Sequence, residues 1–235
     1  KVAQKKLKKT RDNPESFRQW RLLKKFNKKT GQLKVREPSL ENNQVVDLGN
    51  YFGEYEALAT RLEALVDKGG DPATPVRRCG SQTDNCCFRY FELGLIEAIY
   101  LHNRVNRLLK GEVRNEAIQS ALGIAHQTRE IKKQTVGNGI RDRAAEEALE
   151  REYRLRTLRC PLSVHQQCLL YDNRPLSCRL SNVSIAVDSE KDIYAALQTL
   201  SKNIFLAFNG TFMENGELAF SMADTISGRF IQKYF

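Results

Sequence analysis

The residues best suited to chemistry in this sequence are its six cysteines, which fall in two groups about seventy residues apart. The groups consist of Cys79, Cys86 and Cys87, and of Cys160, Cys168 and Cys178. Cysteines that only filled a core would not gather in two loops flanked by Arg, Pro and Gly, so we expect the groups to converge. Thiolates bind soft metals, and four of them close a tetrahedral zinc site or hold a four-iron cluster. We therefore predict a zinc or iron–sulfur site at these cysteines.

The spacing of the cysteines leaves other structures open. Six residues separate Cys79 from Cys86, and no interval in either group is the two-residue gap of a zinc knuckle. An even number of cysteines also permits three disulfides, and inert buried thiols are a further alternative. A disulfide framework fits less well, because it is typical of short secreted chains and this chain can bury its own core. Adjacent Cys86 and Cys87 project in different directions, which favours a polynuclear centre over a single zinc ion.

The residues around the cysteines form a longer pattern. Its parts are Cys79-Gly80, Cys86-Cys87, Cys160-Pro161-Leu162, Cys168, Leu170-Tyr171, Arg174-Pro175 and Cys178-Arg179. This pattern resembles the cysteine-cluster family of zinc- or iron-chelating proteins, to which flagellin lysine N-methylase belongs. The resemblance covers residues 79–179 and implies that all six cysteines serve a metal or cluster.

The chain departs from that family in two places. Five residues, Ser81–Asn85, stand between Cys79-Gly80 and the cysteine doublet where the family commonly has one, and Val76 occupies the place of a further cysteine. Glu92 or Glu97 stands where the family often has an acid in the following helix. The departures leave the ligand set open.

Several other side chains near the cysteines could take part. Arg174 and Arg179 would offset the charge of thiolates, or they are ion-pair partners at the surface. His165 lies inside the second cysteine loop and is a candidate substitute ligand. His102 and His126 have the pattern of ordinary helix residues.

Two alternative functions stay open beside a structural or redox metal site. The resemblance makes methyl transfer from S-adenosylmethionine to protein lysines conceivable. No Gly-x-Gly-x-x-Gly loop follows a strand, and we find no Ser/His/Asp or paired-carboxylate arrangement, so the sequence does not decide whether the chain is an enzyme. The other alternative is a binding module that acts through a basic arm.

That arm carries the positive charge of the chain, which is +10 overall. Residues 1–36 hold 14 Lys and Arg and two acids, whereas the remainder holds 24 basic and 26 acidic residues. Phe17, Trp20, Leu23 and Phe26 recur every three residues within it and predict a basic amphipathic helix. It could dock on the body or bind an unidentified protein partner. Nucleic acid is not favoured, because no recognisable nucleic-acid motif is present.

Residues 44–235 are expected to form one helical cysteine-cluster domain. Apolar spacing predicts helices from Val45 to Val66, Phe88 to Lys110 and Met222 to Tyr234, and weaker ones over 112–134 and 141–158. A further helix should open at a capping box formed by Ser189 and Asp192 and end at Gly210. Short strands are expected only over 168–171 and 183–187. The expected fold is therefore mainly α, with the two cysteine loops converging on a metal or cluster site.

The apolar residues also bear on where the protein works. No apolar run approaches the roughly 18 to 20 residues of a membrane span, so we expect no transmembrane segment and a cytoplasmic protein. Because the first residue is Lys1 and not Met, we expect the chain to begin within a longer polypeptide.

Overall fold

The computed structural model describes residues 47–69, 78–81, 83–135, 143–181, 183, 185–210 and 218–234. Within these residues the protein is mainly helical, which confirms the expected fold class: 72% of them lie in helices, and strands form only two small sheets. The basic arm, residues 1–36, lies outside the described residues. Its boundary with residues 44–235 therefore stays a prediction.

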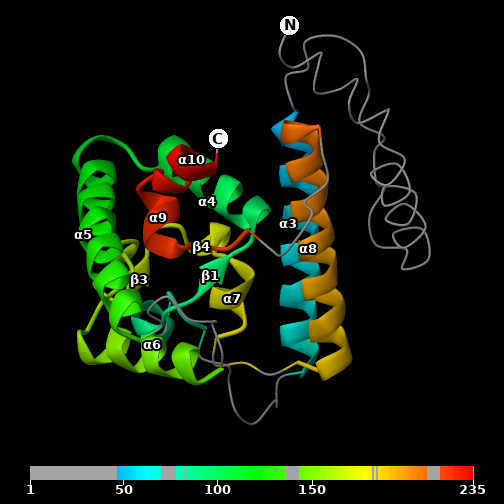
Figure 1. Ribbon diagram of the computed structural model, residues 1–235. Helices are drawn as coiled ribbons and strands as arrows, with labels where there is room; N and C mark the ends of the chain where they lie inside the picture. Colours follow the sequence, from blue (N-terminus) through cyan, green and yellow to red (C-terminus); the bar gives the residue numbers. More distant parts are fainter. Residues whose placement is uncertain are drawn as a thin grey trace, which may run out of the picture. The chain divides into compact units, whose positions relative to one another are not determined.

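The secondary structure elements follow one another as labelled in Figure 1. The α-helices are α3 (Leu48–Gly69), α4 (Leu95–Leu108), α5 (Gly111–Thr135), α6 (Arg143–Leu155), α7 (Leu176–Arg179), α8 (Val187–Asn209), α9 (Met222–Ile226) and α10 (Arg229–Tyr234). Two short 3₁₀ helices are η1 (Asn85–Phe88) and η2 (Tyr171–Asn173). The strands are β1 (Glu92–Leu93), β2 (Ser163–Val164), β3 (Gln167–Cys168) and β4 (Phe220–Ser221). Both sheets are antiparallel pairs, β1 with β4 and β2 with β3.

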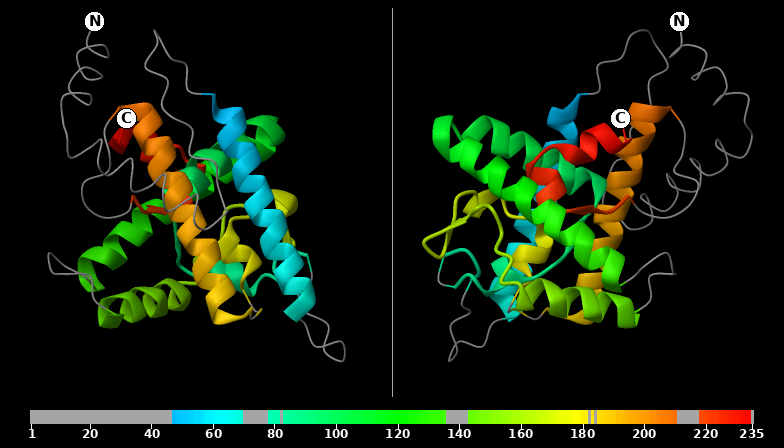
Figure 2. Two further views of the ribbon diagram at one scale, coloured as in Figure 1. Left: turned by 90° about the vertical axis from the view of Figure 1, so that its right-hand side faces the viewer. Right: turned by 60° about the vertical axis from the view of Figure 1, so that its left-hand side comes forward.

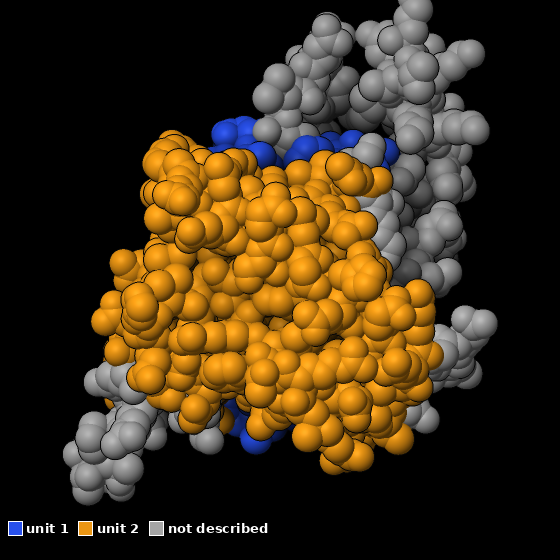
Figure 3. All heavy atoms as spheres, turned by 90° about the vertical axis from the view of Figure 1, so that its left-hand side faces the viewer, with its two compact units in different colours: residues 1–62, 94–96, 186–218 blue, residues 63–93, 97–185, 219–235 orange. Residues whose placement is uncertain are grey.

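The chain forms two compact units, which Figure 3 distinguishes by colour. Unit 1 takes its described residues from 1–62, 94–96 and 186–218, and unit 2 takes its own from 63–93, 97–185 and 219–235. All six cysteines belong to unit 2. The candidate site can therefore be described within one unit.

Unit 1 is formed mainly by α8 and the part of α3 that ends at Leu62, and the two helices run in opposite directions (Figures 1 and 2). On α3, Phe52, Tyr55 and Leu62 are buried at the helical spacing that the sequence indicated. Helix α8 begins at Val187 with Ala186 as its N-cap, so the predicted capping box at Ser189 was wrong. The predicted end of this helix, at Gly210, was right.

The core of unit 2 lies where α5 contacts α6 and α9. Ile124 and Ile131 of α5 are buried against Leu149 and Tyr153 of α6, and Ala223 of α9 joins the same cluster. Leu149 and Tyr153 lie one turn apart on α6, whose other positions are mostly charged. This amphipathic pattern explains why a helix rich in Glu and Arg still packs on the core.

The predicted central helix, from Phe88 to Lys110, begins later than expected. Helix α4 spans Leu95–Leu108, and the residues before it form η1 and strand β1, in which Glu92 lies opposite Ser221 of β4. Leu93 lies opposite Phe220 in the same pair, so contacts with a distant segment hold these residues in extended backbone. The cysteine doublet therefore sits in a 3₁₀ turn and does not open the α-helix.

The last predicted helix is divided by Gly228, which separates α9 from α10. Gly228 has a φ of +75°, and a Cβ at this position would lie 2.9 Å from Cε1 of His102. Only glycine accepts both the left-handed backbone and so close a neighbour. The prediction of one continuous helix from Met222 to Tyr234 was therefore wrong.

The predicted strands were also partly wrong. Cys168 is in a strand, β3, but this strand ends at Cys168 and does not continue to Tyr171. Its partner β2 comes directly before it in the chain, so that residues 163–168 form a tight hairpin. Residues 183 and 185–186 are not in a strand, and Val187 begins α8. Within the described residues, no helix combines the length and the apolar character needed to cross a membrane.

Candidate metal centre

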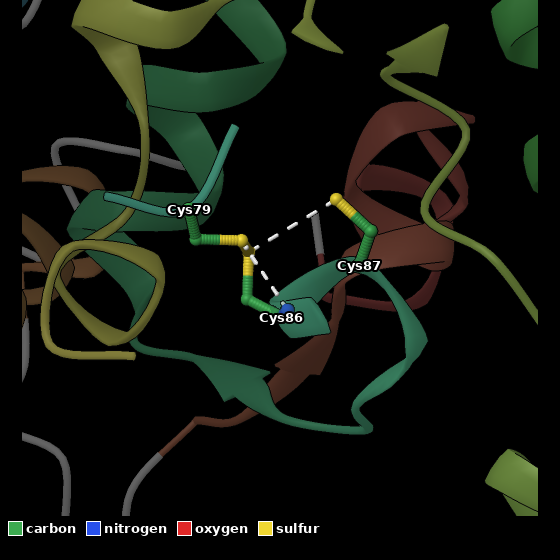
Figure 4. Close-up of side chains that lie close together, drawn as sticks. All are labelled: Cys79, Cys86 and Cys87. Atoms are coloured by element: carbon green, nitrogen blue, oxygen red, sulfur yellow. Dashed lines mark hydrogen bonds between the residues drawn. A yellow bond between two sulfur atoms is a disulfide. The ribbon is translucent and has the colours of Figure 1, made fainter. Parts of the chain in front are cut away.

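The first cysteine group forms a compact cluster of sulfur atoms in unit 2 (Figure 4). The Sγ atoms of Cys79, Cys86 and Cys87 all lie within 4.8 Å of one another, and the three residues are 1%, 4% and 6% exposed. Such a buried group could hold a metal ion when its thiols are free. Cys79 and Cys86 are joined by a disulfide, with their Cα atoms 6.0 Å apart. The Sγ of Cys87 lies 4.0 Å from that of Cys86.

A tight turn at Gly80 shapes this group. The Gly80 N–H donates to the Thr83 carbonyl at 2.6 Å, and Gly80 has a φ of +88°. The chain then enters η1, where the Cys87 N–H donates to the Asp84 carbonyl at 2.8 Å. The Asp84 carboxylate in turn accepts from Arg159, at 2.7 Å. The turn and the ion pair fix the doublet beside the chain that leads to Cys160.

The second cysteine group is spread over three local structures. Cys160 follows α6 in a turn, Cys168 ends the β2–β3 hairpin, and Cys178 lies in the short helix α7. His165 occupies the hairpin turn with a φ of 48° and is exposed. The imidazole of His165 is therefore displayed on the surface.

Backbone hydrogen bonds join the two cysteine groups directly. The Cys160 N–H donates to the Cys87 carbonyl at 2.7 Å, and the Cys168 N–H donates to the Gly80 carbonyl at 2.9 Å. The approach at Gly80 is close, since a Cβ there would lie 2.8 Å from the Cβ of Cys168. The two groups thus meet, although about seventy residues separate them in the chain.

A small pocket lies where the groups meet. Five of the six cysteines line it, namely Cys86, Cys87, Cys160, Cys168 and Cys178. The remaining wall is largely apolar and includes Phe91, Leu101, Leu162, Leu170 and Met222. An apolar wall limits the access of water to any group bound among the thiols.

A partly buried ion-pair network centred on Glu63 supports the second cysteine loop. Glu63 accepts hydrogen bonds from Arg179 at 2.7 Å and from Arg78. Burial alone would raise the pKa of Glu63, but the hydrogen bonds from Arg179 and Arg78 outweigh it and lower that pKa. Arg174 approaches the same carboxylate at 3.4 Å. The carboxylate therefore stays ionised and holds three guanidinium groups together.

Arg174 connects this network to the cysteines. Its side chain is 4% exposed, stacks over Tyr171 at 3.7 Å and donates to the carbonyl of Cys79. The same charge acts to lower the pKa of Cys168 and Cys178 against the effect of burial. Arg174 therefore lies where it can offset thiolate charge, and its ion pair with Glu63 is not at the surface, as one interpretation had it. Arg179 is chiefly an ion-pair partner of Glu63.

The thiols themselves differ in protonation. A hydrogen bond with Cys160 is the main reason why the pKa of Cys87 is lowered to about 7, and burial opposes this effect. The same bond and burial raise the pKa of Cys160 well above its ordinary value. Burial likewise raises the pKa of Cys168 and of Cys178. Of the pair Cys87 and Cys160, Cys87 is therefore the thiol that ionises more readily, and the Cys160 thiol donates the hydrogen bond to it.

The acids and the other histidines have structural partners. Glu97 is 2% exposed, and its Oε1 accepts from the Leu176 N–H at 2.8 Å, which fastens α7 and Cys178 to the start of α4. Glu92 pairs with Lys132 at 2.8 Å. His102 Nδ1 lies 3.1 Å from the Thr225 carbonyl, and His126 is exposed on α5.

Two residues that support the site were missed in the sequence. Glu63 lies on a helix far from the cysteines in the chain, and Asp84 is one of several polar residues in a loop. Nothing in their local spacing distinguishes them from solvent-exposed acids, because their partners come from distant segments. Comparison of the chain with protein-family models, with curated proteins and with solved structures finds no match.

Proposed function

We propose that this chain is a metal-binding protein that holds an iron–sulfur cluster at its cysteine pocket, in a structural or redox role. The observation that carries the proposal is the meeting of sulfur atoms from both cysteine groups around one buried, largely apolar pocket. Thiolate sulfur is the donor that soft metal centres prefer. The donor set fits such a centre, because five cysteines and no carboxylate line the pocket among the described residues.

The character of the pocket favours a cluster over a single zinc ion. The donors available are the four free thiols, Cys87, Cys160, Cys168 and Cys178, a number that also closes a zinc site. The apolar wall would exclude water, and burial is one of the means by which proteins adjust cluster potentials. The resemblance to the cysteine-cluster family supports metal binding in general and favours neither metal.

The chain's own residues would serve the bound group in separate ways. An iron–sulfur cluster would supply one-electron redox chemistry or a rigid cross-link between the two cysteine loops. Arg174 lies where it can offset thiolate charge, and Glu63 holds it in that position. Glu97 and the Gly80 turn keep the second loop against the first.

The test is the metal content of full-length protein purified without oxygen. We expect brown protein with iron and acid-labile sulfide in equal amounts and little zinc. Colourless protein with about one zinc per chain would replace the cluster by a zinc site. Protein without either metal would refute the proposal, and absence of free thiols would then indicate disulfides.

His165 offers a matched control for that experiment. The position of His165 in the second cysteine loop made it a candidate substitute ligand, but its ring lies in an exposed hairpin turn. His165→Asn keeps a residue that tolerates positive φ and removes the imidazole. We expect unchanged metal content in this variant, and a clear loss would place the imidazole among the ligands.

A further inference from the structure

The six cysteines are not equivalent in this structure. Cys79 and Cys86 share a disulfide, whereas Cys87, Cys160, Cys168 and Cys178 are free. A sulfur atom in a disulfide is not a thiolate, and the thiolate is the form that binds metals. The Cα separation of 6.0 Å is ordinary for a disulfide, so the pair can be bridged in this backbone.

The four free thiols lie close together in the fold. All four line the same pocket. The Cys160 N–H donates to the Cys87 carbonyl at 2.7 Å, which places a residue of the second group directly beside the free thiol of the first. Four is the number of thiolates that closes a tetrahedral zinc site or holds a four-iron cluster. One ligand would come from the first cysteine group and three from the second.

Positive charge is also arranged around these four. Arg174 lines the pocket together with the four cysteines, and Arg159 pairs with Asp84, whose carbonyl accepts from the Cys87 N–H. Four thiolates carry more negative charge than a zinc ion or a four-iron cluster neutralises, so nearby guanidinium groups stabilise the loaded site. Arg174 is nearly fully buried, as a residue with this task in the protein interior must be.

We propose, on the basis of the metal-binding function above, that Cys87, Cys160, Cys168 and Cys178 form the metal site and that Cys79 and Cys86 are a separate redox pair. The pair interconverts between a disulfide and two thiols. Its oxidation by a small-molecule disulfide forms the Cys79–Cys86 bond and breaks that of the oxidant. The two thiol protons and two electrons leave with the oxidant as two new thiols.

Adjacent positions provide the matched variants that test this division. Cys86→Ser and Cys87→Ser remove neighbouring, similarly buried sulfur atoms. We expect Cys86→Ser, and the double variant with Cys79→Ser, to keep at least four fifths of the wild-type iron or zinc. Cys87→Ser should lose most of it, as should Cys160→Ser, Cys168→Ser and Cys178→Ser. Equal loss from Cys86→Ser and Cys87→Ser would overturn the proposal and make the Cys79, Cys86 and Cys87 cluster the ligand set.

Differential alkylation of the wild-type chain gives a reading that does not depend on the folding of variants. Metal-loaded protein is equilibrated with a glutathione buffer and then denatured in the presence of a chelator. A first alkylating reagent labels the free thiols. After reduction, a second reagent labels the thiols that were in disulfides. We expect the second label only on Cys79 and Cys86 in oxidising buffer, with metal content unchanged between buffers. Loss of metal as that disulfide forms would overturn the division. Metal-free wild-type protein would instead refute the proposed function, while the labels still report the disulfide.

Discussion

Gly80 holds the two cysteine groups in contact, and adding one methyl group there should separate them. Its φ of +88° is unfavourable for any residue with a Cβ, at a cost of about 1–2 kcal/mol. The new Cβ would also lie 2.8 Å from the Cβ of Cys168 and 3.4 Å from Cδ2 of Tyr171. Overpacking of this kind costs about 1–3 kcal/mol. Gly80→Ala should therefore destabilise the protein by roughly 2–5 kcal/mol.

Thermal unfolding of the metal-loaded chain measures this effect. For a chain of this size, each kcal/mol changes Tm by about 2–4 °C, so we expect Gly80→Ala to lower Tm by roughly 4–20 °C. Metal content should fall as well, because the Cys168 N–H bonds to the Gly80 carbonyl and the backbone must move to relieve the clash.

Gly123 provides the matched control for Gly80. It is an exposed position inside α5, and a Cβ there would meet nothing within 4 Å. Gly123→Ala should raise stability by up to about 1 kcal/mol through helix propensity and leave metal content unchanged. The reasoning about the close approach is refuted if Gly80→Ala matches Gly123→Ala in Tm and in metal content.

Three further predictions concern Glu63 and Glu97, which support the site, and the half-buried His102. Glu63→Gln leaves the buried Arg179 without its carboxylate and should cost about 2–3 kcal/mol in urea denaturation. Because the pKa of Glu63 is lowered, its contribution to the free energy of unfolding is present above about pH 4.3 and is lost on further acidification. The free energies of unfolding of wild type and Glu63→Gln should therefore converge in acid, and a difference that stays constant with pH would contradict this. Glu97→Ala leaves the buried Leu176 N–H without this acceptor and should cost about 1–3 kcal/mol, whereas Glu97→Gln keeps an acceptor and should cost less. Burial lowers the pKa of His102, so on acidification the unfolded chain binds a proton at this imidazole before the folded chain does. Tm should therefore decrease as the pH is lowered below about 6.5. His102→Gln should flatten this pH dependence of Tm, and an unchanged pH dependence would exclude His102 as its cause.

Local spacing predicted the helices well where one face is apolar over several turns. The helices α3, α5 and α6 appear where it placed them. It failed where distant contacts decide the backbone. Phe88–Leu93 has enough apolar residues for a helix, but its last two residues pair with β4, more than a hundred residues away. Gly228 divides a helix because His102 leaves no room for a side chain there.

The sequence allowed the donor atoms of the candidate site to be predicted, but not how the cysteines are paired. Clustering and residue type pointed to the six cysteines, and neither could show that Cys79 and Cys86 pair while the other four stay free. Glu63 was not predictable, because its partners are brought together only by the tertiary fold. Binding of a protein partner or nucleic acid by residues 1–36, methyl transfer and the cytoplasmic location stay predictions.

X-ray absorption at the iron and zinc edges of protein purified without oxygen tests the central claim most directly. The account predicts bound iron with only sulfur in its first coordination shell and a second shell of iron, as in a cluster held by cysteines. A zinc edge with four sulfur atoms at about 2.3 Å would keep the thiolate site and replace the cluster. Nitrogen or oxygen ligands in place of sulfur, or no bound metal, would contradict the account.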